Sequence, residues 1–336
     1  MGIKTVTRNV ARLSRKELQE WERILDISAD ATVFHTPAWI KATADYKNIP
    51  GFVILAYRNK YPVGVFAFFL YKVKWFKQEA ISCVLEMPYG GPVAAAEGNE
   101  GIITALLNAQ KKRFLQVSTA IITSPGQGAA VFRRHGFRIN VRETLIVPLD
   151  VDEETLWSNI GSDNRRMVRK ARKRGVTVEE RGWQELPVFH DLLDSTRERL
   201  ELATPIPLAY YQQIYKALAE NKAIKLLVAY LENKPIAAGL FLYFKNRVTW
   251  WSAGTDRDYW NYAPGTLLQW QIMATARENN YDSYDMLHYH DSKGNLVPSL
   301  KSFKEKFGAR EMKFYHAVKT SKLYEALIGI RGLIKK

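Results

Sequence analysis

The sequence predicts an α/β protein made of two tandem copies of one domain, each with a mixed sheet covered by helices. Three observations lead to this class. The chain has 336 residues, enough for two cores of roughly 150 residues each. A strand–turn–strand segment occurs twice at a fixed spacing. Helix-like and strand-like patterns alternate along the second half, which is typical of a sheet with helices on both faces.

An internal repeat is the main evidence for duplication. The segment FVILAYRNKYPVGVFAFFLY begins at Phe52, and IKLLVAYLENKPIAAGLFLYF begins at Ile224. Both contain Ala-Tyr and, further on, a proline followed by an aliphatic residue, and all four matched pairs share one offset of 173 residues. In each segment apolar β-formers flank a short polar stretch, so each is predicted to form a β-hairpin.

A second motif keeps nearly the same spacing. FRRHGF begins at Phe132 and FKEKFG at Phe303, so the offset drifts by only two residues. Two motifs at nearly one spacing indicate duplication rather than chance. The sequence therefore predicts a first domain over residues 1–150, a second over 151–320, and a basic amphipathic tail over 321–336.

The elements of the second copy follow from apolar periodicity and turn residues. Beside the hairpin, the expected strands cover residues 176–180, 248–252, 283–287 and 311–318. The expected helices cover residues 164–174, 184–202, 208–220, 265–279 and 298–306.

Composition narrows the classes of function. A formal net charge of +15 favours partners rich in phosphate. The single Cys83 excludes an intrachain disulfide and a cysteine-based metal cluster. No secretory leader and no apolar run of roughly 20 residues is recognisable, so a cytoplasmic protein is expected. The tail LYEALIGIRGLIKK suits an anionic membrane surface at the inner face; a docked helix is the alternative.

Several segments together resemble one family. They are FHTPAWIKA from Phe34, PYGGPV from Pro88, NRRMVRKARKRGVTV from Asn164, YAPGTLLQWQIMATARENNYDSYDM from Tyr262 and SLKSFKEKFGAR from Ser299. The order of elements resembles the GNAT acyltransferase fold, and two such domains in tandem resemble the FemABX peptidyltransferases of peptidoglycan cross-bridge synthesis. The resemblance spans roughly residues 30–318 and is to the compact type without a coiled-coil arm.

The resemblance implies an aminoacyltransferase that moves an amino-acyl group from aminoacyl-tRNA to an amine of a cell-wall peptide precursor. The phosphorylated precursor would be nucleotide-linked or lipid-linked. No cofactor besides the aminoacyl-tRNA donor is implied, and a monomer is expected. The chemistry is expected in the second domain, with the acceptor bound on the side of the first.

Lys304 is the main catalytic candidate. Acyl transfer to an amine needs positive charge near the developing oxyanion, and the resemblance implies a functional lysine directly after Phe303. The backbone carbonyl of Phe303 is a candidate acceptor for the attacking amine. The alternative for Lys304 is a solvated helix face, and the first copy has Arg133 at the equivalent place.

Seven further residues are candidates for substrate binding, mostly by resemblance. Glycines beside Tyr89 permit close backbone approach, and Lys41 could pair with a precursor phosphate. A tyrosine pair matches the family, but the arginine that often precedes it is missing, so Arg199 is taken as the nearest substitute. The full set is Lys41, Tyr89, Arg199, Tyr210, Tyr211, Trp251 and Tyr262.

The segment 165–174 carries seven Arg or Lys among ten residues. Affinity for nucleic acid comes mainly from phosphate contacts, so this segment is predicted to bind tRNA through Arg165, Arg166 and Arg169. A solvated helix face is the alternative. The six histidines form no ligand set with metal spacing, and no metal is expected.

Two other functions remain open from the sequence. An acyl-CoA-dependent N-acyltransferase would hold pyrophosphate on a glycine-rich loop at a helix start. The corresponding segment, WNYAPG from Trp260, lacks the leading Gln or Arg and the first glycine, and Pro264 removes a backbone donor. The third function is a non-enzymatic basic module that binds nucleic acid or membrane on an inactive acyltransferase scaffold.

Overall fold

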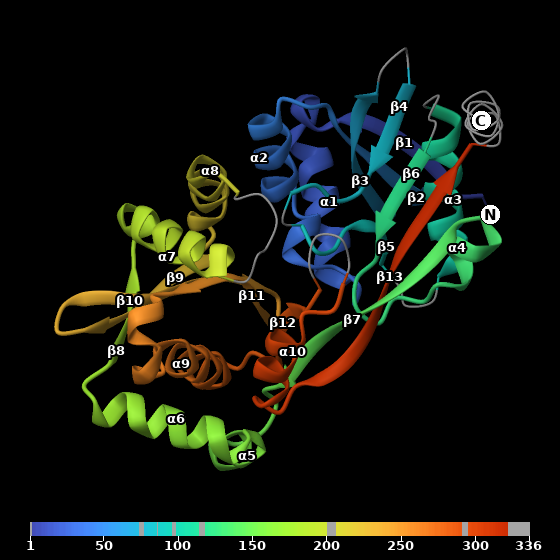
Figure 1. Cartoon of the computed structure of the whole chain (residues 1–336). Coiled ribbons are helices and arrows are strands. Elements are labelled where there is room, and N and C mark those ends of the chain that lie inside the picture. Colours follow the sequence, from blue (N-terminus) through green and yellow to red (C-terminus); the bar gives the residue numbers. More distant parts are fainter. Residues whose placement is uncertain are drawn as a thin grey trace, which may run out of the picture. The chain divides into compact units, whose positions relative to one another are not determined.

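The computed structural model describes residues 2–73, 77–85, 87–95, 99–113, 118–199, 206–290 and 295–321. The chain divides into two compact units, one made of Met1–Arg142 with Lys313–Lys336 and the other of Glu143–Met312. Both units are α/β (Figure 1). Of the tail predicted over 321–336, all but Ser321 lies outside the described residues.

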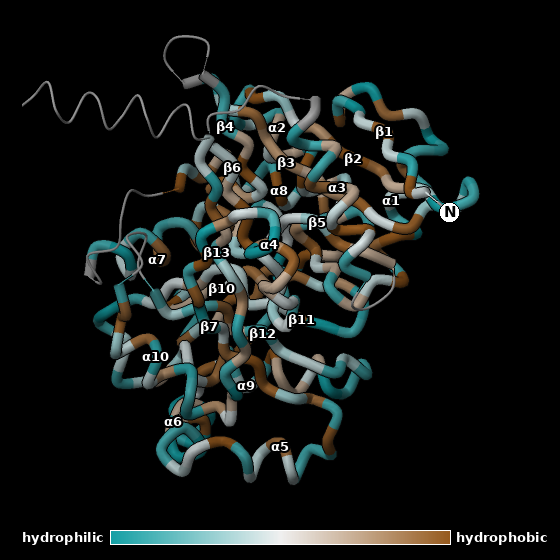
Figure 2. The backbone as a smooth tube through the Cα atoms, turned by 90° about the vertical axis from the view of Figure 1, so that its right-hand side faces the viewer, coloured by the Kyte–Doolittle hydropathy of each residue, from teal (hydrophilic) through white to brown (hydrophobic). Residues whose placement is uncertain are grey.

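The first unit contains a sheet in the order β1-β2-β3-β4-β6-β13, with β5 paired to β3. Its core is built from β2, β3, α3 and α4, and the tube of β2 and β3 is mostly brown in Figure 2. The elements are β1 (Lys4–Asn9), η1 (Val10–Arg12), α1 (Arg15–Ile27), η2 (Val33–His35), α2 (Pro37–Lys47), β2 (Gly51–Arg58), β3 (Tyr61–Val73), β4 (Lys77–Ile81), β5 (Gly91–Ala94), α3 (Glu100–Arg113), β6 (Ser118–Ile122), α4 (Ala130–Arg134) and most of β13 (Arg310–Thr320).

The second unit contains a sheet in the order β7-β12-β11-β10-β9-β8. Helices α7 and α8 lie on one face of this sheet and α9 with α6 on the other (Figure 1). The elements are most of β7 (Arg138–Pro148), α5 (Glu153–Asn159), α6 (Ser162–Lys173), β8 (Thr177–Arg181), η3 (Trp183–Glu185), α7 (Leu186–Arg199), α8 (Leu208–Ala219), β9 (Ile224–Leu231), β10 (Lys234–Phe244), β11 (Arg247–Thr255), η4 (Arg257–Tyr262), α9 (Pro264–Glu278), β12 (Ser283–His288) and α10 (Pro298–Glu305).

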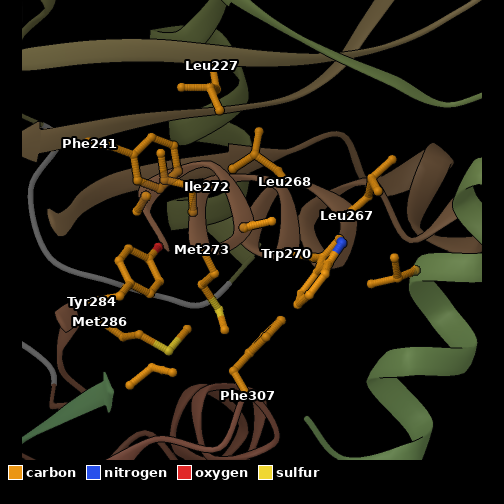
Figure 3. Packing of buried hydrophobic residues seen from close by; sticks show 14 of the residues in the cluster. Leu227, Phe241, Leu267, Leu268, Trp270, Ile272, Met273, Tyr284, Met286 and Phe307 are labelled. Atoms are coloured by element: carbon orange, nitrogen blue, oxygen red, sulfur yellow. The ribbon is translucent and has the colours of Figure 1, made fainter. Parts of the chain in front are cut away.

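The core of the second unit lies between its sheet and α9. Ten residues of α9 are buried, more than a one-sided surface helix would bury. In Figure 3 the side chains of Met273, Met286 and Phe307 converge beneath this helix, and all three are fully buried. This packing fixes α9 and α10 against β12, where the candidate site lies.

The two predicted hairpins are present and share their irregularities. Strands β2 and β3 pair antiparallel, as do β9 and β10. Each turn has two consecutive residues with positive φ, Asn59 and Lys60 in the first and Glu232 and Asn233 in the second, the conformation of a type I′ hairpin turn. Each second strand then has a register shift at the same relative place. Sterically costly turns and bulges at matching positions support duplication.

The division between the units differs from the boundary expected at residue 150. It falls between Arg142 and Glu143, and residues 313–336 are grouped with the first unit. The reason is strand pairing, because His316–Thr320 of β13 pair with β6. The expected strand over 311–318 exists, but its pairing partner lies almost two hundred positions earlier in the sequence.

Within the described parts of the chain, no helix is both long and apolar enough to span a bilayer.

Candidate functional site

The candidate site lies where β11 and β12 separate. The two strands pair in parallel at three positions, the last being Thr249 with Asp285. Directly beyond, Trp251 is an extra residue in the pairing of β11 with β10. Strand β12 also has a register shift, with Leu287 at φ 60°. Bulges redirect strands and often lie beside active sites. We call the place where the pairing of β11 with β12 ends the gap.

Lys304 reaches this gap from α10. Its side chain is only 4% exposed. The ammonium donates to the backbone carbonyls of Met286, Leu287 (3.3 Å) and His288 (2.8 Å). Its Nζ also lies 4.9 Å from the centroid of the Trp250 ring. Lys304 therefore joins the irregular end of β12 to β11 at the point where their own pairing stops.

This position differs in one respect from the sequence expectation. An ammonium has three N–H donors, and three carbonyl oxygens of β12 lie within hydrogen-bond distance of it. In this arrangement no donor remains for a substrate oxyanion. The indole N–H of Trp250, by contrast, is buried and has no hydrogen-bond acceptor among the described residues.

Asp285 stabilises the bulge of β12 through hydrogen bonds to its carboxylate. The carboxylate belongs to a fully buried residue, and its Oδ1 accepts from the Thr144 hydroxyl (2.7 Å) and the Leu287 amide (2.9 Å). The bond to Leu287 fixes the residue with positive φ. A buried charge is tolerated when it is hydrogen-bonded and has an opposite charge nearby, and Lys304 supplies that charge.

Burial lowers the pKa of Lys304 to about 7, although the negative charge of Asp285 acts in the opposite direction. A charged ammonium taken out of water loses hydration, which favours the neutral amine. The three carbonyl contacts, however, need the protonated form. The contacts between Lys304 and β12 therefore depend on pH close to neutrality.

Folding stability should consequently depend on pH through Lys304. Its pKa is about 7 when folded and 10.5 for an unperturbed lysine, so between these values the unfolded chain binds more protons. The free energy of unfolding should therefore rise with pH across this window, by at most about 1.4 kcal/mol per pH unit. Urea denaturation of the wild type and Lys304→Met at several pH values measures this. Parallel curves for the two proteins would contradict the assignment.

A cluster of aromatic rings surrounds the bulge residue Trp251 on the side of α7 and α8. The ring centroid of Trp251 lies 5.1 Å from that of Tyr211 and 6.1 Å from that of Tyr210. Both tyrosines are fully buried. Burial raises the pKa of Tyr211 to about 12, so its hydroxyl stays protonated. The structure thus brings together three of the predicted substrate-binding residues.

Arg197 belongs to this cluster and was missed in the sequence. It is 9% exposed and donates to the Tyr211 hydroxyl (3.3 Å). Sequence analysis favoured Arg199, whose side chain lies outside the described residues. Helical periodicity could have found the right residue, because Phe189, Leu193 and Arg197 recur at the spacing of one buried helix face.

The equivalent gap in the first unit is closed by its own chain. Strands β4 and β6 pair in parallel at three positions and then separate, as β11 and β12 do. There the Ile122 amide donates to Ser82 Oγ (3.0 Å) and the Gly90 amide donates to the Ile122 carbonyl (2.8 Å). A Cβ on Gly90 would lie 2.7 Å from Cys83 Sγ. Arg133, the counterpart of Lys304, is exposed.

Two predicted residues of the first unit have other surroundings. Tyr89 has no exposed surface, and its ring meets Phe34 and Phe314 edge-on. Lys41 is on the surface of α2 and pairs with Asp45 (2.7 Å).

The three arginines predicted to bind nucleic acid lie on α6 with different partners. Arg165 donates to the carbonyls of Ser158 and Ile160 at the end of α5. Arg166 pairs with Asp163 (3.3 Å), and the guanidinium of Arg169 lies over the Trp157 ring (5.4 Å). Arg165 thereby supplies hydrogen bonds to carbonyl groups at the end of a helix. Part of its donor capacity is therefore taken by its own unit rather than left for a phosphate.

The remaining candidates lie near helix ends. Phe303 is half-buried, with its ring 6.2 Å from that of Trp250. Tyr262 is half-buried beneath the guanidinium of Arg174 (5.1 Å). Among the described residues, no group of three or more His, Cys, Asp or Glu side chains is placed to hold a metal ion.

Part of the second unit is similar to a family of known domains and to known enzymes. Residues 162–295 match the family model described as an acetyltransferase (GNAT) domain. The chain is 32% identical over 129 residues to the lipid II:glycine glycyltransferase of Staphylococcus haemolyticus, which is 36% of this chain and 30% of that protein. It is 34% identical over 110 residues to the protein of the same name from Staphylococcus aureus, a match that covers 31% of this chain and 26% of that protein. The matches span less than a third of these relatives.

Solved structures extend the comparison to the whole fold. The chain superimposes on the crystal structure of FemX with a TM-score of 0.75 at 16% identity, covering 93% of this chain and 96% of that one. It matches a tandem GNAT protein from the clavulanic acid biosynthesis pathway with a TM-score of 0.57 at 9% identity, and the match covers 95% of this chain and 98% of that one.

These matches confirm the predicted fold class, two tandem GNAT-like α/β domains with mixed sheets. About a third of the chain is similar in sequence to lipid II:glycine glycyltransferases, and the fold of most of the chain is similar to that of FemX. These similarities support the resemblance to the FemABX family, and residues 162–295 match an acetyltransferase (GNAT) domain.

Proposed function

We propose that this protein is an aminoacyltransferase that moves an amino-acyl group from aminoacyl-tRNA to an amine on the peptide of a lipid-linked peptidoglycan precursor. The observation that carries the proposal is the end of the pairing between β11 and β12, bridged by the buried Lys304, in the unit whose residues 162–295 match a GNAT domain. The staphylococcal relatives, named lipid II:glycine glycyltransferases, support the class of acceptor.

The reaction exchanges one bond for another. The acceptor amine attacks the carbonyl carbon of the aminoacyl ester, a C–N bond forms, and the C–O bond to the tRNA ribose breaks. The amine proton goes to the leaving ribose oxygen. Negative charge develops on the carbonyl oxygen, so a fixed donor in a dry site lowers the barrier.

We assign the roles in the gap as follows. The indole N–H of Trp250, buried and without an acceptor in the described structure, is the donor for the acyl oxygen. Lys304 acts as a positioning residue that fixes β12 and adds positive charge 4.9 Å from the Trp250 ring. The Phe303 carbonyl remains the proposed acceptor for the attacking amine.

Arg197 is proposed to shape the acceptor side of the site. It orients Tyr211 beside the bulge at Trp251, so Arg197→Met should raise KM for the precursor about tenfold, the loss expected for one hydrogen bond from a charged group. Lys216→Met is the matched control, because this cation is exposed on the neighbouring helix α8. Steady-state kinetics decide this, and equal effects of the two variants would remove Arg197 from the site.

An acyl-CoA donor is the second candidate, favoured by the description of the matched family model. Helix α9 begins with Ala263 in a left-handed conformation and Pro264 at its first position. Proline has no N–H to offer a pyrophosphate at this helix start. We therefore favour the tRNA ester as donor.

The donor and acceptor are tested together. The purified protein is incubated with lipid-linked precursor and either a mixture of charged tRNAs or acyl-CoA, and the products are identified by mass spectrometry. The proposal expects a mass gain of one amino-acyl residue with charged tRNA alone. A nucleotide-linked precursor in a parallel reaction defines the form of the acceptor. Product with acyl-CoA but not with charged tRNA would overturn the donor assignment.

A further inference from the structure

An aromatic surface precedes α9 in the second unit. The 3-10 helix η4 presents Tyr259, Trp260 and Tyr262 within four residues. Trp260 is 49% exposed, unusual for so large an apolar side chain. The rings of Tyr259 and Tyr262 are 5.8 Å apart and half-buried. This surface plays no part in the roles assigned above to Lys304 and Arg197.

Cations lie directly beside these rings. Arg174, which follows α6, places its guanidinium 5.1 Å from the Tyr262 ring and donates to the Asn261 carbonyl (2.9 Å). Lys234 lies 4.2 Å from the Tyr259 ring and 3.3 Å from Asp256. The end of α6 is thus tied to η4 by specific contacts, so the basic and aromatic residues form one surface.

Two further cations, Arg172 and Lys173, lie at the end of α6. Arg172 and Lys173 are exposed, and within the described parts of the chain neither is in ion-pair contact with a carboxylate. Arg165 and Arg169, by contrast, contact carbonyls and a ring of their own unit. The tube of α6 is mostly teal in Figure 2. Arg172 and Lys173, which directly precede Arg174 in the sequence, are therefore available to an anion.

We propose that η4 and residues 172–174 form a binding site for unpaired nucleotides of RNA. Proteins that bind single strands combine aromatic rings, on which bases stack, with cations that follow the backbone. Trp260 would stack on a base, and Arg172 with Lys173 would contact the adjoining phosphates. The site rests on the proposed function, since the unpaired end of the donor tRNA would be its ligand.

The test measures binding of a fluorescently labelled single-stranded RNA octamer to the full chain by anisotropy, with an RNA duplex of equal length in parallel. Trp260→Ala should weaken single-strand binding about tenfold to a hundredfold, the range for losing one stacked base. Trp183→Ala is the matched control, because Trp183 is 58% exposed in the same unit and should change affinity less than about twofold.

The cationic part is tested separately. Arg172→Glu with Lys173→Glu should weaken both RNA probes and reduce the salt dependence of binding. Equal affinity of the Trp260 and Trp183 variants for the single strand would overturn the site, even if aminoacyl transfer occurs. If CoA at the same concentration as the octamer displaced it, the Trp260 ring would be assigned to the adenine of a cofactor, and the proposed RNA site would also be overturned. Trp260-dependent RNA binding without any transfer would keep the site and refute the proposed function.

Discussion

Lys304→Met is expected to lower the single-turnover rate of aminoacyl transfer by about a hundredfold to a thousandfold, the scale of the loss when the donor to the developing oxyanion is misplaced. Methionine fills the same space but leaves the carbonyls of Met286, Leu287 and His288 without their buried donor. The end of β12 should relax, and the positive charge beside Trp250 is lost. Rapid-quench measurement at saturating substrate reports the rate directly.

A matched control separates this effect from a general loss of charge. Arg133→Met removes the equivalent cation of the first unit, which is exposed, and should leave the rate unchanged. Thermal unfolding must show that Lys304→Met is still folded at the assay temperature. A folded Lys304→Met protein with the wild-type rate would remove Lys304 from the mechanism.

Gly254→Ala is expected to destabilise the second unit by about 3 kcal/mol, at the upper end for overpacking. A Cβ at this position of β11 would lie 2.2 Å from Leu192 C and Leu193 N, which are backbone atoms of α7. A helix backbone cannot yield as a flexible side chain does, so α7 must shift. Because α7 carries Arg197, the same change should displace that guanidinium from Tyr211.

Gly128→Ala is the control, since a Cβ there meets nothing within 4 Å. Chemical denaturation of both variants gives the two free energies of unfolding. An alanine usually stabilises relative to glycine where the backbone permits it, because the unfolded chain loses freedom. A neutral or stabilising Gly254→Ala would show that α7 and β11 are not in such close contact.

Local patterns predicted most elements of the second half. The expected helix over 208–220 is α8 (Leu208–Ala219), and the expected strand over 283–287 is β12 (Ser283–His288). Hairpins and amphipathic helices depend on residues close in sequence, which explains this agreement. The grouping of β13 with the first unit depends on pairing with β6, and neither strand's composition specifies its partner.

The site could be predicted less fully than the fold. The family resemblance drew attention to Lys304, whereas the spacing of the neighbouring lysines also allowed a solvated helix face. Its burial follows from the bulge in β12, which leaves backbone carbonyls without strand partners. Similarly, PYGGPV indicated a backbone that approaches closely, and it does, but Gly90 approaches β6 rather than a substrate. Such features depend on contacts between residues far apart in the chain.

The central claim is that the reacting acyl group binds in the gap between β11 and β12. A tRNA carrying an amide-linked, diazirine-bearing aminoacyl group, which resists transfer, can be photo-crosslinked to the protein and the modified peptides identified by mass spectrometry. The account predicts crosslinks to residues 249–252 and 286–288. Crosslinks confined to the first unit, around residues 82–90, would contradict it.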